Sequence, residues 1–225
     1  LAESLGRPDF LAAVHTNLSS LYLQQQDINA AAGAAEDALR VLRRAGSAGA
    51  GALPLTQAAI IQARQGNLPA STRLFREALD EAYLRADPAT LGLIWDQLGY
   101  ELLLNGNLDE AETALVEAFR IRKLSGLKDL QYSYYTLGML HLARNRPEEA
   151  ARMLDAALSL LSKPPVTLAL WRVHYERGRA ALQAGFPAEA LEHFRRAVGH
   201  ARQVRMELLP ADSVWINTGV MATSP

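Results

Sequence analysis

Apolar and small residues recur along this chain at steps of three and four, the spacing of one face of an α-helix. The stretch from Trp95 to Ala118 shows the pattern most clearly, with Gly106-Asn107 separating two stripes. Because Gly99 has no side chain, we expect it to face Ala111 and to let two backbones approach closely. The pattern predicts two antiparallel helices joined by a tight turn. The stripes consist of Trp95, Leu98, Gly99 and Leu102, and of Ala111, Leu115 and Ala118.

Copies of this stretch follow one another along the chain. Residues equivalent to Gly99 are separated by 40, 40, 39 and 40 positions, and the small residues of the second stripe recur in the same register. Chance does not place five copies in register, even in an alanine-rich chain. The equivalents of Gly99 are Ser19, Ala59, Gly138 and Gly178.

The repeats predict an all-α chain of about eleven helices, arranged as antiparallel pairs. We expect Pro8-Asp9 to end a preceding segment, so that the first helix begins near Leu11. A further half-copy, Trp215-x2-Thr218-Gly219, predicts the first helix of a sixth unit, and a capping helix or tail is the alternative. The expected units are 11–45, 53–86, 89–126, 128–163 and 166–207, followed by 208–225.

The order of large residues, glycine and alanine in these copies resembles the tetratricopeptide repeat (TPR) family, whose unit has about 34 residues. The resemblance implies one array over residues 1–225, a right-handed α-solenoid or TPR superhelix. Units of about 40 residues resemble the arrays of large bacterial regulators, such as signal-transduction ATPases with helical sensor arms. The stretch from His174 to Asp212 also resembles the repeats that precede CHAT peptidase domains. Since the chain begins at Leu1, we expect it to be a segment of a longer bacterial protein.

Composition narrows the classes of partner. With 23 Lys and Arg against 24 Asp and Glu, the net charge of −1 gives no indication of nucleic-acid or membrane-surface binding. The absence of cysteine excludes disulfides and thiolate chemistry. No apolar run has the length of a membrane-spanning helix, so we expect a cytoplasmic protein that binds no membrane.

The sequence indicates no catalytic, cofactor or metal site. His141 and His174 occupy packing positions, where a buried, hydrogen-bonded histidine is expected. His193 and His200 lie seven residues apart on one helix face and can in principle hold a metal, but nothing at helical spacing completes a ligand set, so solvated histidines are the expectation. No nucleophile–base pattern occurs, and we expect no enzyme active site within this segment.

Recognition of a protein is the remaining function. In the resembled family, the first helix of each unit lines a concave groove that holds a peptide or protein segment, and tyrosines suit such a surface. The alternative, that the tyrosines only pack between units, stays open. A second hypothesis makes the chain the regulatory arm of a larger enzyme, a CHAT peptidase or a signalling ATPase. The predicted partner-binding residues are Asp96, Tyr100, Tyr132, Tyr135, Met139, Arg172, Tyr175 and Arg179.

Overall fold

The computed structural model describes residues 7–47, 51–126, 129–161 and 170–207, apart from the side chains of 204–207. Every regular element in these ranges is an α-helix, which confirms the predicted class. The helices fall into two compact units, residues 1–129 and 130–225, and each is described by itself. Whether the chain forms the single array predicted over 1–225 stays a prediction.

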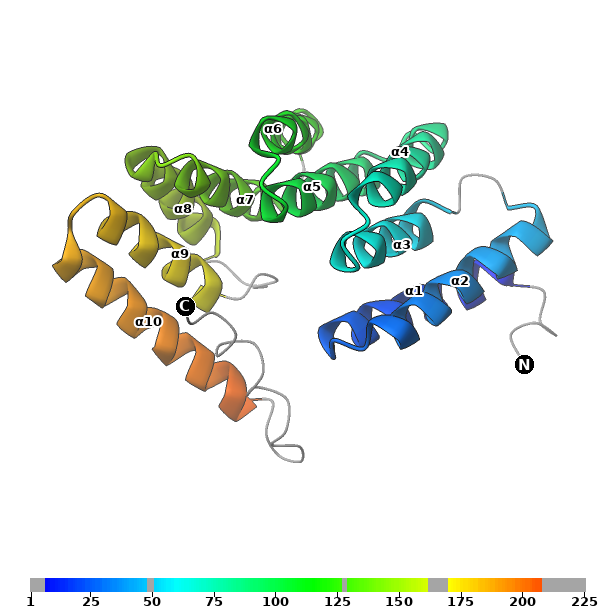
Figure 1. The fold of residues 1–225 in the computed structure, drawn as a ribbon, viewed down its shortest axis with the longest axis horizontal. Helices are drawn as coiled ribbons and strands as arrows, with labels where there is room; N and C mark the ends of the chain where they lie inside the picture. The colour runs from blue at the N-terminus through cyan, green and yellow to red at the C-terminus, as the bar shows by residue number, and fades with distance from the viewer. Residues whose placement is uncertain (1–6, 48–50, 127–128, 162–169, 208–225) are drawn as a thin grey trace. The chain divides into compact units, whose positions relative to one another are not determined.

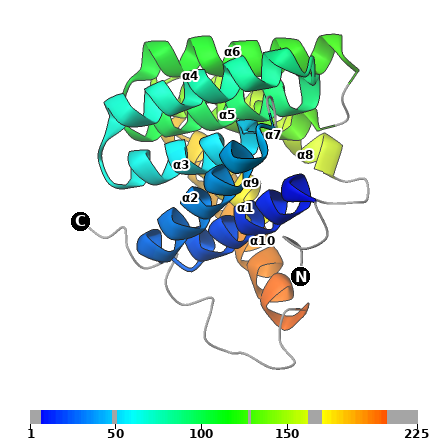
Figure 2. The same cartoon turned by 90° about the vertical axis from the view of Figure 1, so that its right-hand side faces the viewer.

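The first unit contains three antiparallel helix pairs (Figure 1). Each helix also packs against the next along the chain, and Figure 2 shows α1 and α2 side by side at the opposite end of this unit from α6. The pairs are α1 (Pro8–Gln24) with α2 (Ile28–Ala45), α3 (Ala52–Arg64) with α4 (Leu68–Leu84), and α5 (Pro88–Leu104) with α6 (Leu108–Leu124).

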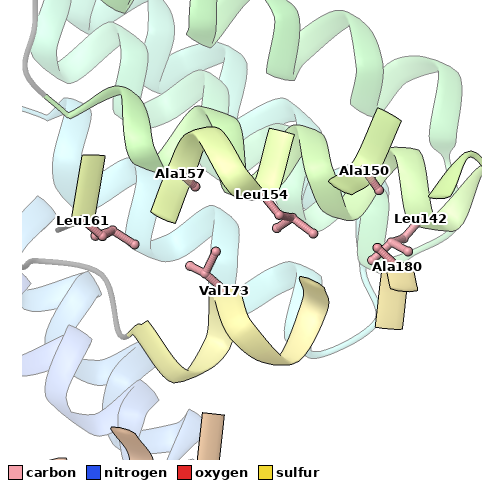
Figure 3. Packing of buried hydrophobic residues seen from close by; sticks show 7 residues of the cluster. All are labelled: Leu142, Ala150, Leu154, Ala157, Leu161, Val173 and Ala180. Atoms are coloured by element: carbon pink, nitrogen blue, oxygen red, sulfur yellow. The ribbon is translucent and has the colours of Figure 1, made fainter. Parts of the chain in front are cut away.

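The second unit contains two described pairs, α7 (Leu130–Ala143) with α8 (Pro147–Leu161), and α9 (Leu170–Gln183) with α10 (Pro187–Glu207). Its core lies where α8 meets its two neighbours. Figure 3 shows Val173 of α9 directed at α8, where Leu154 and Leu161 are also fully buried. Small residues, Ala150 and Ala157, alternate with these leucines and allow α8 to approach both α7 and α9.

The turn inside each pair has the same backbone geometry at the same place in the repeat. One residue there adopts a left-handed conformation, with φ of 81° at Gly66, 80° at Gly106 and 85° at Gly185. Gln26 and Asn145 adopt it without the freedom of glycine, at φ of 61° and 56°. These residues are spaced 40, 40, 39 and 40 apart, as the predicted anchors are. The register read from the sequence is therefore the register of the turns.

The glycine anchors lie at close helix contacts, but their partner differs from the prediction. A Cβ added to Gly99 would lie 2.6 Å from Leu115 Cγ, so Leu115 rather than Ala111 is the residue that the glycine accommodates. Gly138 accommodates Leu154 in the same way, and Gly178 accommodates Phe194. The large side chain of the second helix thus lies over the glycine of the first. The physical reason is that a helical side chain leans towards the N-terminus and covers the turn before its own Cα.

Two other expectations need correction or lie outside the description. The first helix begins at Pro8, not near Leu11, because proline without its N–H is tolerated in the first turn of a helix. The predicted helix around Trp215 lies in 208–225, outside the described residues. Among the described helices, none combines the length and the apolar character that a membrane span requires.

Candidate functional site

The predicted binding residues divide between the two units. Asp96 and Tyr100 belong to α5 of the first unit, and the other six belong to α7 and α9 of the second. On α7 and α9 they occupy equivalent positions 40 residues apart, and these two helices contact each other. We call this surface the α7–α9 face; it comprises Tyr132, Tyr135 and Met139 of α7 with Arg172, Tyr175 and Arg179 of α9.

Asp96 has an internal role in the first unit. Its carboxylate forms a buried ion pair with Arg122 of α6, whose Nε also lies 3.1 Å from an oxygen of Asp129. The side chains of Arg122 and Asp96 are only 2% and 6% exposed. The stem of Arg122 lies over Gly92, where a Cβ would meet it at 3.1 Å. The ion pair gives Asp96 a role in the packing of α5 on α6, and its contact with a partner stays a prediction. Tyr100 is half-buried.

The tyrosines of α7 take part in the core as well as in the surface. Tyr132 and Tyr135 are half-buried and pack against the hydrophobic cluster that joins α7, α8 and α9. Met139 is half-buried too. Packing between repeats, the alternative that the sequence left open, is thus part of the role of Tyr132 and Tyr135. Their remaining exposed edges lie on the α7–α9 face.

The residues of α9 are the most accessible part of the face. Tyr175 is 45% exposed, and its ring lies 5.8 Å from that of Phe194 on α10, at 47°. The guanidinium of Arg172 lies 5.3 Å from the ring of Trp171. This part of α9 therefore offers the ring of Tyr175, which packs against Phe194, and the exposed positive charge of Arg172 three residues before it. Such a surface suits an apolar or aromatic side chain that is accompanied by a carboxylate.

The second arginine of the face is partly neutralised. Arg179 Nη1 donates to Glu176 Oε2 at 2.7 Å, and Glu176 is 6% exposed. Burial raises the pKa of the Glu176 carboxyl, while the charge and hydrogen bond of Arg179 act in the opposite direction. Since the nearby carboxylate offsets the charge of Arg179, Arg172 is the better candidate to meet an acidic group of a partner.

One feature that the sequence did not predict is a cavity of about 300 Å³ in the first unit, near the N-terminal ends of α1, α3 and α5. Several lining residues have small side chains, which leave this space open. A pattern of residue spacing does not predict such a space, because it shows where large side chains recur and not where they are missing. The lining of the cavity includes three charged residues, Asp9, Arg85 and Asp87. Asp87 is engaged as the N-cap of α5 and accepts a hydrogen bond from Ala89 N at 3.0 Å. The alanines that line the cavity are Ala12, Ala13, Ala52 and Ala82.

A second feature that the sequence did not predict is a cluster of three histidines between α9 and α10. His174 Nδ1 lies 3.1 Å from His193 Nδ1, and the ring of His174 stacks on that of His200 at 5.4 Å and 4°. The sequence placed His193 and His200 on one face but did not join His174 to them. In the part of the chain that the structure describes, no group of three or more His, Cys, Asp or Glu side chains is arranged to hold a metal ion.

Comparison with known proteins gives one family and several similar folds. Residues 135–205 match the tetratricopeptide repeat family, and this range contains α9, most of α10 and most of the α7–α9 face. BtubC (BKLC) from P. vanneervenii has a TM-score of 0.71 and 16% identity, over 92% of this chain and 85% of that one. The comparison with curated proteins found no match.

Two further solved structures share the fold. The TPR-like repeats of a putative kinesin light chain from Podosopora anserina give a TM-score of 0.64 at 16% identity, over 89% of this chain and 98% of that one. MamA from Desulfovibrio magneticus RS-1 gives 0.55 at 20% identity, over 85% and 96%. At these identities the similarity establishes the fold alone.

Proposed function

Because the chain is a tetratricopeptide-repeat protein, we propose that it is an interaction scaffold whose α7–α9 face binds a segment of another protein. Stacked helical repeats build extended surfaces that such proteins use for binding. The observation that carries the proposal is Tyr175, a 45% exposed aromatic side chain on a first helix, inside the range that matches the family.

The chemistry of the face selects the kind of segment. Tyr175 offers apolar area with a polar hydroxyl, and Arg172 offers an exposed positive charge beside it. We propose a peptide with an aromatic or large aliphatic residue close to an acidic one. Tyr132, Tyr135 and Met139 extend the apolar surface along α7, and Arg179 adds a cation shared with Glu176.

A displayed library of random peptides supplies a probe. The tightest selected peptide is measured against the unmodified chain, Tyr175→Ala and Arg172→Ala. Truncation of a buried aromatic anchor costs about 2 kcal/mol, so Tyr175→Ala should weaken binding about thirtyfold. Tyr135→Ala and Arg179→Ala should also weaken it, but Tyr135 contacts the core, which makes Tyr175 the cleaner probe.

Matched controls lie on the other helices of the same unit. Arg152 on α8 is exposed and pairs only loosely with Glu149, at 3.9 Å, and Arg195 on α10 is exposed. Arg152→Ala and Arg195→Ala should leave the affinity unchanged. If these variants abolish binding while Tyr175→Ala spares it, the α7–α9 face is not the binding surface. If Ala13→Leu alone abolishes binding, the cavity of the first unit is the site.

A further inference from the structure

The interface of α9 with α10 contains more imidazole than any other described helix pair. His174 is 7% exposed and lies where the third repeat has Trp95. It contacts His193 through its Nδ1 atom and stacks on His200. An apolar ring at this position would serve packing alone, whereas an imidazole can take up a proton. The pair of helices therefore has a titratable centre.

The groups that surround His174 make its protonation unfavourable. Burial, then the neighbouring His193 and His200, lower the pKa of His174 to about 4, and Arg196 of α10 acts in the same direction. Asp155 of α8 is the nearby group that opposes this shift. α7 also packs on α9, and its titratable side chains are Tyr132, Tyr134, Tyr135 and His141.

His193 has a comparable environment. Its pKa is lowered by burial and by Arg177 of α9 and Arg196 of α10, against the opposite effect of Asp155 and Glu189. Arg177 keeps its charge, since its Nε lies 2.8 Å from Asp155 Oδ1 and its Nη2 lies 2.5 Å from Glu189 Oε1. This arginine ties α8, α9 and α10 together, so a proton on His193 adds a second cation beside a fixed one.

We propose that the His174–His193–His200 cluster makes the α9–α10 pair acid-sensitive, so that α9 is held firmly against α10 at neutral pH and released from it in mild acid. A group whose pKa falls on folding stabilises the fold above its unfolded value, about 6.5 for histidine, and loses that contribution as the pH falls towards its folded value. The window therefore runs from about pH 6.5 down to about pH 4.

The release of α9 from α10 also alters the α7–α9 face, and its effect on a partner rests on the proposed function. Tyr175 follows His174 directly, and its ring lies against Phe194 of α10. Phe194 in turn packs over Gly178, where a Cβ would meet it at 2.6 Å. When α9 separates from α10, Tyr175 loses the ring that holds it in place. A partner gripped at neutral pH is then released in acid.

Hydrogen exchange of the chain without a partner tests the cluster by itself. After correction for intrinsic rates, the opening equilibrium of α9 and α10 amides should rise up to about thirtyfold between pH 7.5 and pH 5, given pKa values near 6.5 unfolded and 4 folded. Amides of α1 and α2 provide the internal reference. Glu176 has a raised pKa and acts in the opposite direction, so the comparison is made between variants.

His174→Phe should remove most of the acid-induced rise in the opening equilibrium of α9 and α10 that exceeds the rise in α1 and α2. His15→Gln on α1 should leave this excess intact. If His174→Phe does not fold, His193→Gln and His200→Gln, at half-buried positions, should each reduce the rise. An exchange rise in α9 and α10 no larger than that in α1 and α2 overturns the proposal, as does a full rise in the folded variants.

The regulatory part has its own readout. The selected peptide should bind at least tenfold more weakly at pH 5 than at pH 7.5, and His174→Phe should abolish the difference. An exchange rise without this loss of affinity overturns the release of the partner. If no peptide binds at pH 7.5, the proposed function fails, and the exchange measurement still decides on the acid-sensitive pair.

Discussion

At the scale of single residues, three of the five described helix pairs depend on a glycine that accommodates one large side chain. Gly99, Gly138 and Gly178 lie under Leu115, Leu154 and Phe194, with a Cβ at 2.6 to 2.7 Å from the nearest atom in each case. The first pair has a different solution. Ser19 is fully buried there and its Oγ donates to Ala31 O at 2.8 Å, while the facing large residue is replaced by Ala35. In the second pair, Ala59 takes the place of the glycine while the large Phe75 is kept, and both are fully buried.

Gly99→Leu should overfill this contact and lower the free energy of unfolding by about 1–3 kcal/mol, the usual cost of overpacking. Chemical denaturation measures the change. Gly33→Ala on α2 is the matched control, because a Cβ there meets nothing within 4 Å and alanine favours a helix, so a gain of about 0.5–1 kcal/mol is expected. An unaltered stability of Gly99→Leu would show that Gly99 is not at a close helix contact.

The buried ion pair of Asp96 and Arg122 gives a second test at this scale. Asp96→Ala should cost about 3–5 kcal/mol, because it leaves the guanidinium of Arg122 buried without its main counter-charge. The double variant Asp96→Leu, Arg122→Met should recover much of this loss, since apolar replacements of a buried pair are often neutral. Thermal and denaturant unfolding measure both. If Asp96→Ala is harmless and instead abolishes peptide binding, Asp96 is a contact residue as the sequence predicted.

At the scale of helices, the sequence predicted more than at the scale of side chains. Helix pairs, turns and their register follow from small residues and glycine at fixed spacing, which are local signals. The pairing of Asp96 with Arg122 and of His174 with His193 joins residues 26 and 19 positions apart on different helices. Such contacts depend on how each helix is rotated about its own axis, and this rotation could not be predicted from a single sequence. The cavity escaped prediction for a related reason, since missing bulk leaves no pattern.

The outer side of α10 carries apolar side chains that are covered at equivalent positions elsewhere. Leu158 of α8 is half-buried against α9, and Leu79 of α4 is 5% exposed, whereas the equivalent Val198 of α10 is 50% exposed. Leu191, two helical turns before Val198 on the same side of α10, is also 50% exposed. A following helix is what covers these positions in the other pairs, which supports the prediction that 208–225 begins a sixth unit.

Under the sixth-unit prediction, deletion of residues 208–225 should lower the melting temperature and promote aggregation, because these residues are then what covers the apolar side of α10. Leu191→Lys with Val198→Glu in the shortened chain should restore solubility, since terminal repeats need a polar outer face. Light scattering and thermal unfolding measure the outcome. A shortened chain as stable and soluble as the original would show that 208–225 contributes no sixth-unit packing.

At the scale of the whole molecule, the chain is a set of repeats grouped into two compact units. Each described repeat has the same left-handed turn, and three of them, in both units, have the same glycine contact, so the units share one structural rule. The two units differ in the chemistry of their polar side chains. The first unit has the cavity and the Asp96–Arg122 pair, and the second has Tyr175, Arg172 and the histidine cluster. The scaffold is repetitive, while the proposed recognition and its acid sensitivity belong to the second unit.

Site-specific photo-crosslinking tests the central claim most directly. Benzoylphenylalanine is placed singly at Tyr175 or Met139 on the α7–α9 face, at Arg152 or Arg195 on the other helices of the second unit, and at Ala13 in the cavity. The selected peptide is added and illuminated, and the crosslinked fraction is read by mass spectrometry. The account predicts crosslinks from positions 175 and 139 and none above background from 152, 195 or 13. Crosslinks confined to 152 and 195, or to 13, would contradict it.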